Sequence, residues 1–158
     1  MVALKVFLPD ERATLALGAA LAGGLEPGLT IYLRGDLGAG KTTVIRGVLR
    51  ALGHQGPVRS PTYTLVEVYA VSRLDLHHFD FYRFHDPREW IDAGFRESFN
   101  GRTVSLIEWP ERAGGLLPPA DVEIALALHE AGRSAVLTSN TLRGQKCLAS
   151  LEERWPAS

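Results

Sequence analysis

The sequence predicts an α/β protein, because apolar β-rich runs alternate with helical patterns along most of its 158 residues. The run TIYLR leads into GDLGAGKTT at residues 35–43 and then into a helix with an apolar face, which is the context of a phosphate-binding loop. Near the C-terminus, two alternating runs flank the turn EAGR and predict a hairpin. Together these observations predict a P-loop NTPase-like fold of three layers, with a mixed, largely central sheet and a C-terminal β-hairpin.

The first part of the chain predicts two strands and two helices. Short strands are expected at 2–8 and 29–33. Asp10 can cap the first helix, which a glycine pair ends at 23–24. The second helix is expected at 41–53, with these apolar residues on one face: Val44, Ile45, Val48, Leu49 and Leu52.

The middle of the chain predicts three strands and one short helix. The strands are expected at 63–71, 76–82 and 103–108, and the last of them ends on an acid. The helix is expected at 86–94, because Asp86 can cap it, a proline suits its first position and a glycine closes it.

The last part predicts a loop at 109–119, hairpin strands at 121–130 and 133–139, and a surface helix at 142–155. The sequence shows neither an internal repeat nor a linker. We therefore expect one P-loop ATPase domain over residues 1–158.

Composition narrows the class of protein. The net charge is −1, from 17 basic and 18 acidic residues, whereas a dedicated nucleic-acid binder usually carries a strong basic excess. The single cysteine, Cys147, cannot form an intramolecular disulfide, which suits a reducing cytoplasm. The first residues lack the apolar run of a secretory signal, and the apolar stretch at 13–25 is too short to span a bilayer. The prediction is a cytoplasmic protein without a membrane partner.

The phosphate loop is the most specific chemical signal. Gly35, Gly40, Lys41 and Thr42 fill the pattern G-x-x-x-x-G-K-[ST]. Its glycines let backbone N–H groups point at phosphate oxygens, the lysine adds a positive charge, and the threonine hydroxyl can bind magnesium. We expect these residues to contact the nucleotide: Gly35, Gly38, Ala39, Gly40, Lys41, Thr42 and Thr43. ATP is favoured over GTP because the guanine-binding NKxD pattern is absent.

Two acids are candidates for the magnesium site. Glu108 ends the most apolar strand, and Asp80 lies in the strand segment HFDFYR. A strand's carboxyl end is where ligands of open α/β sheets gather, so position alone gives both acids even odds. His77 and His78 are adjacent on a strand and therefore point to opposite faces, which favours packing over a shared metal.

The loop RSPTYT at 59–64 admits two interpretations. Thr62 or Thr64 could reach a γ-phosphate and act as a nucleotide-sensing switch. Alternatively, Pro61 sets an extended backbone in an ordinary loop that enters a strand. Taken by itself, the segment slightly favours the ordinary loop.

Several motifs together resemble the bacterial TsaE (YjeE) family. They are GDLGAGKTT, SPTYTLVE, HFDFYR, DPREW-x-x-x-G and IEWPE, in this order. The resemblance runs from the first helix to the hairpin turn and leaves the C-terminal helix unsupported. It implies a small magnesium-dependent P-loop ATPase needed to make threonylcarbamoyladenosine on tRNA, working with the TsaB–TsaD heterodimer. It further implies slow hydrolysis of ATP to ADP that responds to the partners, contact with tRNA only through the complex, and a monomer when alone.

The same resemblance implies roles for individual residues. Catalytic roles fall on Lys41, Thr62, Asp80 and Glu108, and it reverses the preference for an ordinary loop around Thr62. Magnesium ligation falls on Thr42, Asp80 and Glu108. Further residues are implied near the nucleotide: Glu11, Thr14, Trp109, Gly132 and Arg133.

Two other functions use the same loop. A small-molecule kinase needs an acceptor site and usually an arginine-bearing lid, for which Arg83, Arg88 and Arg96 are possible members. A nucleotide-dependent interaction module with negligible turnover is the other alternative. Release of inorganic phosphate without an acceptor distinguishes the ATPase from the kinase, and partner-stimulated release distinguishes it from the module.

Overall fold

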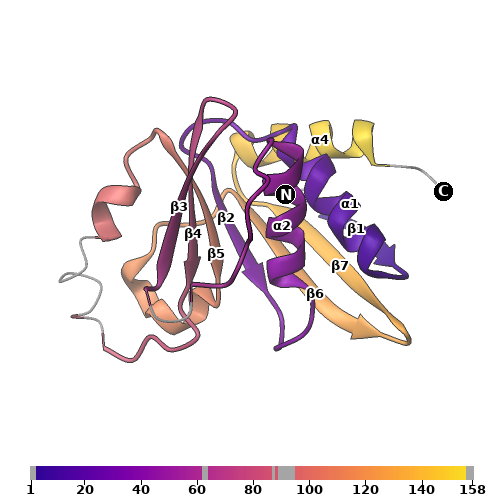
Figure 1. The fold of residues 1–158 in the computed structure, drawn as a ribbon, viewed down its shortest axis with the longest axis horizontal. Helices are drawn as coiled ribbons and strands as arrows, with labels where there is room; N and C mark the ends of the chain where they lie inside the picture. Colours follow the sequence, from indigo (N-terminus) through magenta and orange to yellow (C-terminus); the bar gives the residue numbers. More distant parts are fainter. Residues whose placement is uncertain (1–2, 62–63, 87, 89–94, 156–158) are drawn as a thin grey trace.

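A computed structural model describes residues 3–61, 64–86, 88 and 95–155. Its described strands form one seven-stranded sheet in the order β1-β7-β6-β2-β5-β4-β3 (Figure 1). The strands are β1 (Ala3–Leu8), β2 (Thr30–Arg34), β3 (Val66–Val71), β4 (Leu74–Asp80), β5 (Thr103–Glu108), β6 (Val122–His129) and β7 (Gly132–Ser139). The helices are α1 (Glu11–Ala22), α2 (Lys41–Ala51) and α4 (Leu142–Arg154), with 3₁₀ segments η1 (Phe95–Ser98) and η2 (Pro110–Leu116).

The middle of the sheet is parallel and its edges are antiparallel. β2 pairs in parallel with β5 and β6, and β4 pairs in parallel with β5. At one edge β3 folds back on β4, and at the other β7 and β1 add antiparallel strands. The phosphate loop therefore leaves the central strand β2, whose carboxyl end lies between those of β5 and β6.

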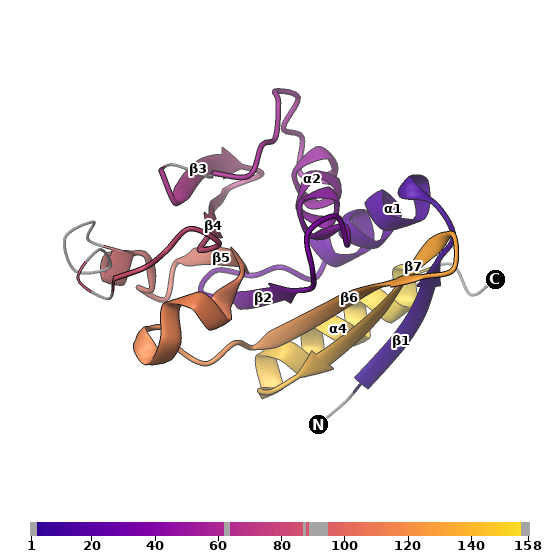
Figure 2. The ribbon, with the colours of Figure 1, turned by 90° about the horizontal axis from the view of Figure 1, so that it is seen from below.

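Alternation along the strands creates a different apolar cluster on each face of the sheet. Ile31 and Leu33 of β2 point into a cluster that contains buried hydrophobic residues of α1, α2 and α4. Tyr32, between them, points to the opposite face, into a cluster of phenylalanines that includes Phe79 and Phe95. Figure 2, turned by 90°, shows α1 and α2 side by side on one side of the sheet.

Two glycines let α1 and α2 pack backbone against backbone. A Cβ on Gly18 would lie 2.1 Å from the carbonyl oxygen of Val44, and one on Gly47 would lie 2.2 Å from that of Leu15. Real Cβ atoms do not approach this closely, so only glycine allows this spacing. The contact fixes the phosphate-loop helix against the helix that carries Glu11 and Thr14.

Most of the expected elements are confirmed, with four differences. The strand expected from 63 begins only at Val66, because Leu65 adopts a left-handed φ of 67°. The turn after it is shorter than expected, since Ser72 and Arg73 both have positive φ and close a two-residue hairpin. The segment expected to be loop at 109–119 contains the 3₁₀ turn η2.

The fourth difference concerns the C-terminal helix, which is not only a surface helix. Cys147, Leu148 and Leu151 of α4 are buried in the apolar cluster that also contains residues of α1. Gly144 packs against the backbone of Asp121, just before β6 begins. Most of the helix expected at 86–94 lies outside the described residues, at 87 and 89–94. Among the residues that are described, no helix combines the length and apolarity needed to cross a bilayer.

The close contact between α1 and α2 predicts a stability effect. Gly47→Ala places a methyl group against the Leu15 carbonyl and should lower the free energy of unfolding by about 1–3 kcal/mol, the usual cost of overpacking. The better helix propensity of alanine offsets part of that cost. Chemical denaturation measures the change. Gly115→Ala is the control, because its Cβ would meet nothing within 4 Å, and equal stability of the two variants would contradict the packing argument.

Candidate nucleotide-binding site

The phosphate loop joins β2 to α2 in the conformation that its glycines allow. Gly38 and Gly40 have φ of 81° and 107°, which L side chains rarely adopt, and Gly40 is the N-cap residue of α2. Gly35 lies against β6, where a Cβ would come within 2.5 Å of the Leu126 carbonyl oxygen. The positive end of the α2 dipole and its free N–H groups are thus directed at the loop, as an anion requires.

Lys41 is almost completely buried beside this loop. Its ammonium donates to the carbonyl oxygens of Gly35 at 2.5 Å and Asp36 at 3.0 Å. The indole ring of Trp109 lies 4.4 Å from the same nitrogen, which is a cation–π distance. Burial lowers the pKa of Lys41, and the negative charges of Glu108 and Asp80 oppose that shift.

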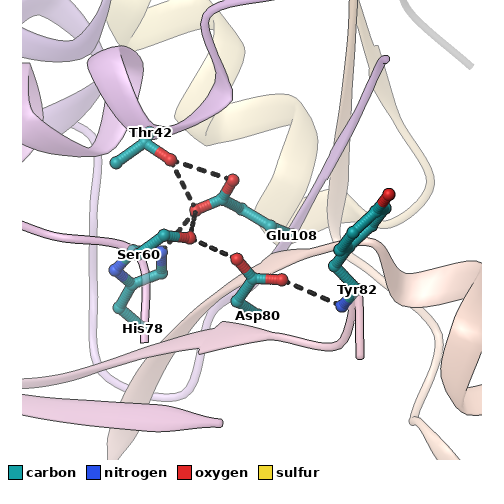
Figure 3. A network of polar contacts seen from close by, with 6 residues as sticks. All are labelled: Thr42, Ser60, His78, Asp80, Tyr82 and Glu108. Atoms are coloured by element: carbon teal, nitrogen blue, oxygen red, sulfur yellow. Dashed lines mark hydrogen bonds and ion pairs between the residues drawn. The ribbon is translucent and has the colours of Figure 1, made fainter. Parts of the chain in front are cut away.

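Two carboxylates lie side by side at the carboxyl ends of neighbouring parallel strands. Asp80 of β4 is in register with Glu108 of β5, and both point to the face that carries α2 (Figure 3). The Thr42 hydroxyl is 3.0 Å from each oxygen of Glu108. Asp80 accepts a hydrogen bond from the backbone N–H of Tyr82 at 2.9 Å. Both acids, to each of which position alone gave even odds, therefore line the same cavity, and Glu108 contacts the threonine.

Two members of this network were missed by sequence reasoning. The Ser60 hydroxyl hydrogen-bonds to Asp80 and lies 3.3 Å from Glu108. The ring of His78 has no exposed surface, and its Nε2 lies 2.6 Å from an oxygen of Glu108. The available signal was strand alternation, since His78 is two residues before Asp80 and must share its face. The expectation that the two histidines separate holds, because His77 contacts Ser98 on the opposite face.

A cavity of about 720 Å³ collects most of the predicted site residues. Its lining includes Glu11, Thr14, Gly38, Gly40, Lys41, Thr42, Thr43, Asp80, Glu108, Trp109, Gly132 and Arg133. Gly35 and Ala39 belong to the same loop but lie outside the lining. Of the kinase-like arginines, Arg83 lines the cavity, whereas Arg88 pairs with Asp86 at the surface.

The two threonines of the possible switch loop have different outcomes. Thr64 is exposed, and its hydroxyl donates to the carbonyl oxygen of Val66 in its own chain segment, at 3.2 Å. It therefore closes a local turn and does not line the cavity. Thr62 lies outside the described residues.

The β6–β7 turn forms the wall of the cavity opposite the acids. Arg133 donates to the Gly38 carbonyl oxygen at 3.0 Å and so ties the turn to the phosphate loop. A Cβ on Gly132 would lie 2.4 Å from the Leu8 carbonyl oxygen, so the turn packs directly on the β1–α1 junction. From α1, the Thr14 methyl group lies 3.4 Å from the position of a Cβ on Gly40. Parts of the chain distant in sequence thus enclose one cavity.

Comparison with known proteins identifies this arrangement. The family model "Threonylcarbamoyl adenosine biosynthesis protein TsaE" matches residues 8–135. The chain belongs to the TsaE family. It is 41% identical over 155 residues to the tRNA threonylcarbamoyladenosine biosynthesis protein TsaE of Haemophilus influenzae, covering 95% of this chain and 98% of that one. It is 40% identical over 119 residues to TsaE of Bacillus subtilis, covering 75% and 72%.

The fold has a solved counterpart among these relatives. The crystal structure of Bacillus subtilis YdiB matches with a TM-score of 0.83 at 29% identity, over 96% of this chain and 95% of that one. The resemblance to the TsaE family and the α/β fold with a mixed sheet, both predicted from the sequence, are therefore confirmed.

The donor set of this TsaE family member suits magnesium bound with a nucleotide. Thr42, Asp80 and Glu108 offer hard oxygen ligands, which is what Mg²⁺ prefers. Among the described residues there is no cluster of three or more His, Cys, Asp or Glu that could hold a metal by itself. A site with few protein ligands fits an ion whose remaining ligands are phosphate oxygens and water.

Trp109 lines the cavity and is the tryptophan that we expect to respond to a ligand there. It has left-handed φ and ψ of 58° and 47°, and its ring contacts Tyr82 and Lys41. We expect ATP with magnesium to change its fluorescence, because a phosphate that pairs with Lys41 alters the charge over the indole. The measurement uses a protein carrying Trp90→Phe and Trp155→Phe, so that Trp109 alone emits. An unchanged spectrum, with binding verified by calorimetry, would mean that the indole is only a packing group.

Proposed function

We propose that this protein binds ATP with magnesium and slowly hydrolyses it to ADP and phosphate, in support of threonylcarbamoyladenosine formation on tRNA. The observation that carries the proposal is the Thr42 hydroxyl at 3.0 Å from Glu108, with Asp80 beside it and Lys41 in the same cavity. A hydroxyl, two carboxylates and an ammonium, which are the groups that a magnesium nucleotide needs, thus line one cavity. The names of the TsaE relatives supply the pathway.

Each group has a defined task in this proposal. Backbone N–H groups of the phosphate loop and the Lys41 ammonium hold the β- and γ-phosphates and offset negative charge that develops as the γ-phosphate leaves. Thr42, Glu108 and Asp80 would hold magnesium, which would neutralise negative charge on the phosphates. The Ser60 hydroxyl contacts both carboxylates and so keeps Asp80 of β4 close to Glu108 of β5. Arg133 holds the phosphate loop against the β6–β7 turn through its hydrogen bond to the Gly38 carbonyl oxygen.

We further propose that the protein acts on a TsaB–TsaD heterodimer and meets tRNA only through that complex. The net charge of −1 supports an indirect contact, because direct binding of tRNA relies on a basic surface. We place the protein in the cytoplasm, as a monomer when alone. The buried Cys147, whose pKa burial raises to about 12, fits a protein that forms no disulfide.

The first test is a paired ATPase assay with and without the TsaB–TsaD heterodimer. Phosphate release without any acceptor molecule, stimulated by the heterodimer, is the expected result. Lys41→Ala should lower the rate at least a hundredfold, since losing one preorganised charge contact costs about 2.7–4 kcal/mol in the transition state. The control is Lys146→Ala on α4, away from the cavity. A rate near wild type for Lys41→Ala would refute the assignment of the site.

The second test separates the two acids. Glu108→Gln and Asp80→Asn keep shape and remove charge, so each should raise the magnesium concentration needed for half-maximal activity. We expect the larger rise for Glu108→Gln, because Glu108 contacts Thr42 whereas the carboxylate of Asp80 contacts Ser60 and Tyr82. Magnesium titration of the ATPase rate measures both. Wild-type titration curves for both variants would place the metal elsewhere.

The third test concerns the partner. A nucleotide changes partner affinity only if it binds two states differently, and this coupling is reciprocal. We expect a non-hydrolysable ATP analogue, and ADP much less, to promote binding to the heterodimer by a factor of roughly 5 to 150. Thr62→Ala should weaken this dependence more than it weakens ATP binding, and Thr64→Ala is the control. Calorimetry with each nucleotide measures the affinity for the heterodimer. Equal affinities in the ATP-like and ADP states would exclude a switch.

A further inference from the structure

His78 of β4 contacts Glu108 but does not line the cavity. Its ring has no exposed surface, yet its Nε2 lies 2.6 Å from Glu108 Oε2. The other ring nitrogen, Nδ1, has no hydrogen-bond partner within the described structure. Glu108 is therefore the group that satisfies this buried ring.

This single hydrogen-bond partner indicates which nitrogen of the His78 ring carries hydrogen. A carboxylate that binds a metal ion is ionised and only accepts hydrogen bonds, so the ring nitrogen 2.6 Å from Glu108 Oε2 has to be the donor. A hydrogen on Nε2 donates to the carboxylate, whereas Nδ1 faces no acceptor among the described residues. His78 is thus a fixed hydrogen-bond donor to Glu108.

The geometry of the two strands makes this donor independent of the cavity. His78 is in register with Leu106 on the adjacent parallel strand, two residues before Glu108, so the imidazole reaches the carboxylate from the strand side. Thr42 and Ser60, the other side chains at Glu108, line the cavity and can turn their hydroxyls toward a ligand. The His78 ring is fully buried, and Glu108 is the hydrogen-bond partner that the described residues give it.

Asp80 and Glu108 are held in different ways. Asp80 accepts a local hydrogen bond from the backbone N–H of Tyr82 at 2.9 Å, in addition to the one from the Ser60 hydroxyl. The hydrogen bonds that the described residues make to the Glu108 carboxylate come from the side chains of Thr42, Ser60 and His78. Thr42 and Ser60 line the cavity whereas His78 does not, so the imidazole is the donor to Glu108 that we expect to remain when a ligand enters.

We propose that His78 is a positioning residue that aims the Glu108 carboxylate at a metal ion beside Thr42. This inference rests on the proposed function, because it presumes a magnesium nucleotide in the cavity. Groups that hydrogen-bond to metal-binding carboxylates and orient them are typically worth 10- to 100-fold in metal affinity.

The test measures metal binding without using catalysis. Mn²⁺ serves as the probe, and its electron paramagnetic resonance signal reports free ion in the presence of a non-hydrolysable ATP analogue. His78→Phe, which keeps a planar ring and removes the donor, should weaken Mn²⁺ binding about 10- to 100-fold. His78→Gln, whose amide can place an N–H near the position of Nε2, should restore most of the affinity. Analogue affinity measured in EDTA should stay the same in all three proteins.

Two controls separate positioning from packing. His77→Phe changes the neighbouring residue on the opposite face, where it contacts Ser98, and should leave Mn²⁺ affinity at the wild-type value. In a Glu108→Gln background, His78→Phe should cause no further loss, because the group it positions is already gone.

The outcomes distinguish the inference from the function beneath it. If wild-type protein shows no metal-dependent nucleotide binding, the proposed function itself fails. If wild type binds Mn²⁺ and His78→Phe binds it equally well, or if His78→Gln is as weak as His78→Phe, only the role of His78 fails.

If the His78 variants do not fold, a measurement on the wild-type protein still tests the proposal. The Nε2–H of His78 should give a downfield proton resonance in NMR that persists when magnesium and the analogue are added. Its loss on ligand binding would overturn the proposal, because the anchor would then not survive in the loaded site.

Discussion

The site depends on holding two like charges next to each other. The register of β4 and β5 sets Asp80 beside Glu108, and neighbouring carboxylates repel unless donors or cations offset their charge. The chain supplies the buried Lys41 ammonium, the hydroxyls of Thr42 and Ser60, and the imidazole of His78. These side chains come from the sheet, the loop after α2 and the phosphate-loop helix, so the same electrostatic requirement joins three parts of the fold.

The fold positions those parts through close backbone contacts as well as side-chain packing. Gly18 and Gly47 set the spacing of α1 and α2, and Gly35 brings the phosphate loop against β6. On the other side, Gly132 seats the hairpin turn on the end of β1, from where Arg133 reaches the loop. A larger side chain at any of these positions moves one wall of the cavity relative to the acids.

Much of this architecture could be predicted from the sequence, because its signals are local. Asp10 caps α1 as expected, β5 matches the expected strand at 103–108, and strand ends place both acids at the site. The remaining features depend on tertiary contacts. The contact between His78 and Glu108 could be predicted only by knowing that β4 and β5 are parallel neighbours in this register. The positive φ of Leu65, because of which β3 begins later than expected, has no local sequence signal.

The strand order has a consequence for how the protein is made. β1 and β2, the first two strands of the described sheet, do not pair with each other, since β1 pairs with β7, and β2 with β5 and β6. A ribosome adding about 5–20 residues per second has therefore completed the phosphate loop many seconds before these partner strands exist. Such distant pairings make folding slow relative to helical proteins. The nascent chain carries the whole GDLGAGKTT motif well before the two acids and the hairpin turn that complete the cavity around it have been synthesised.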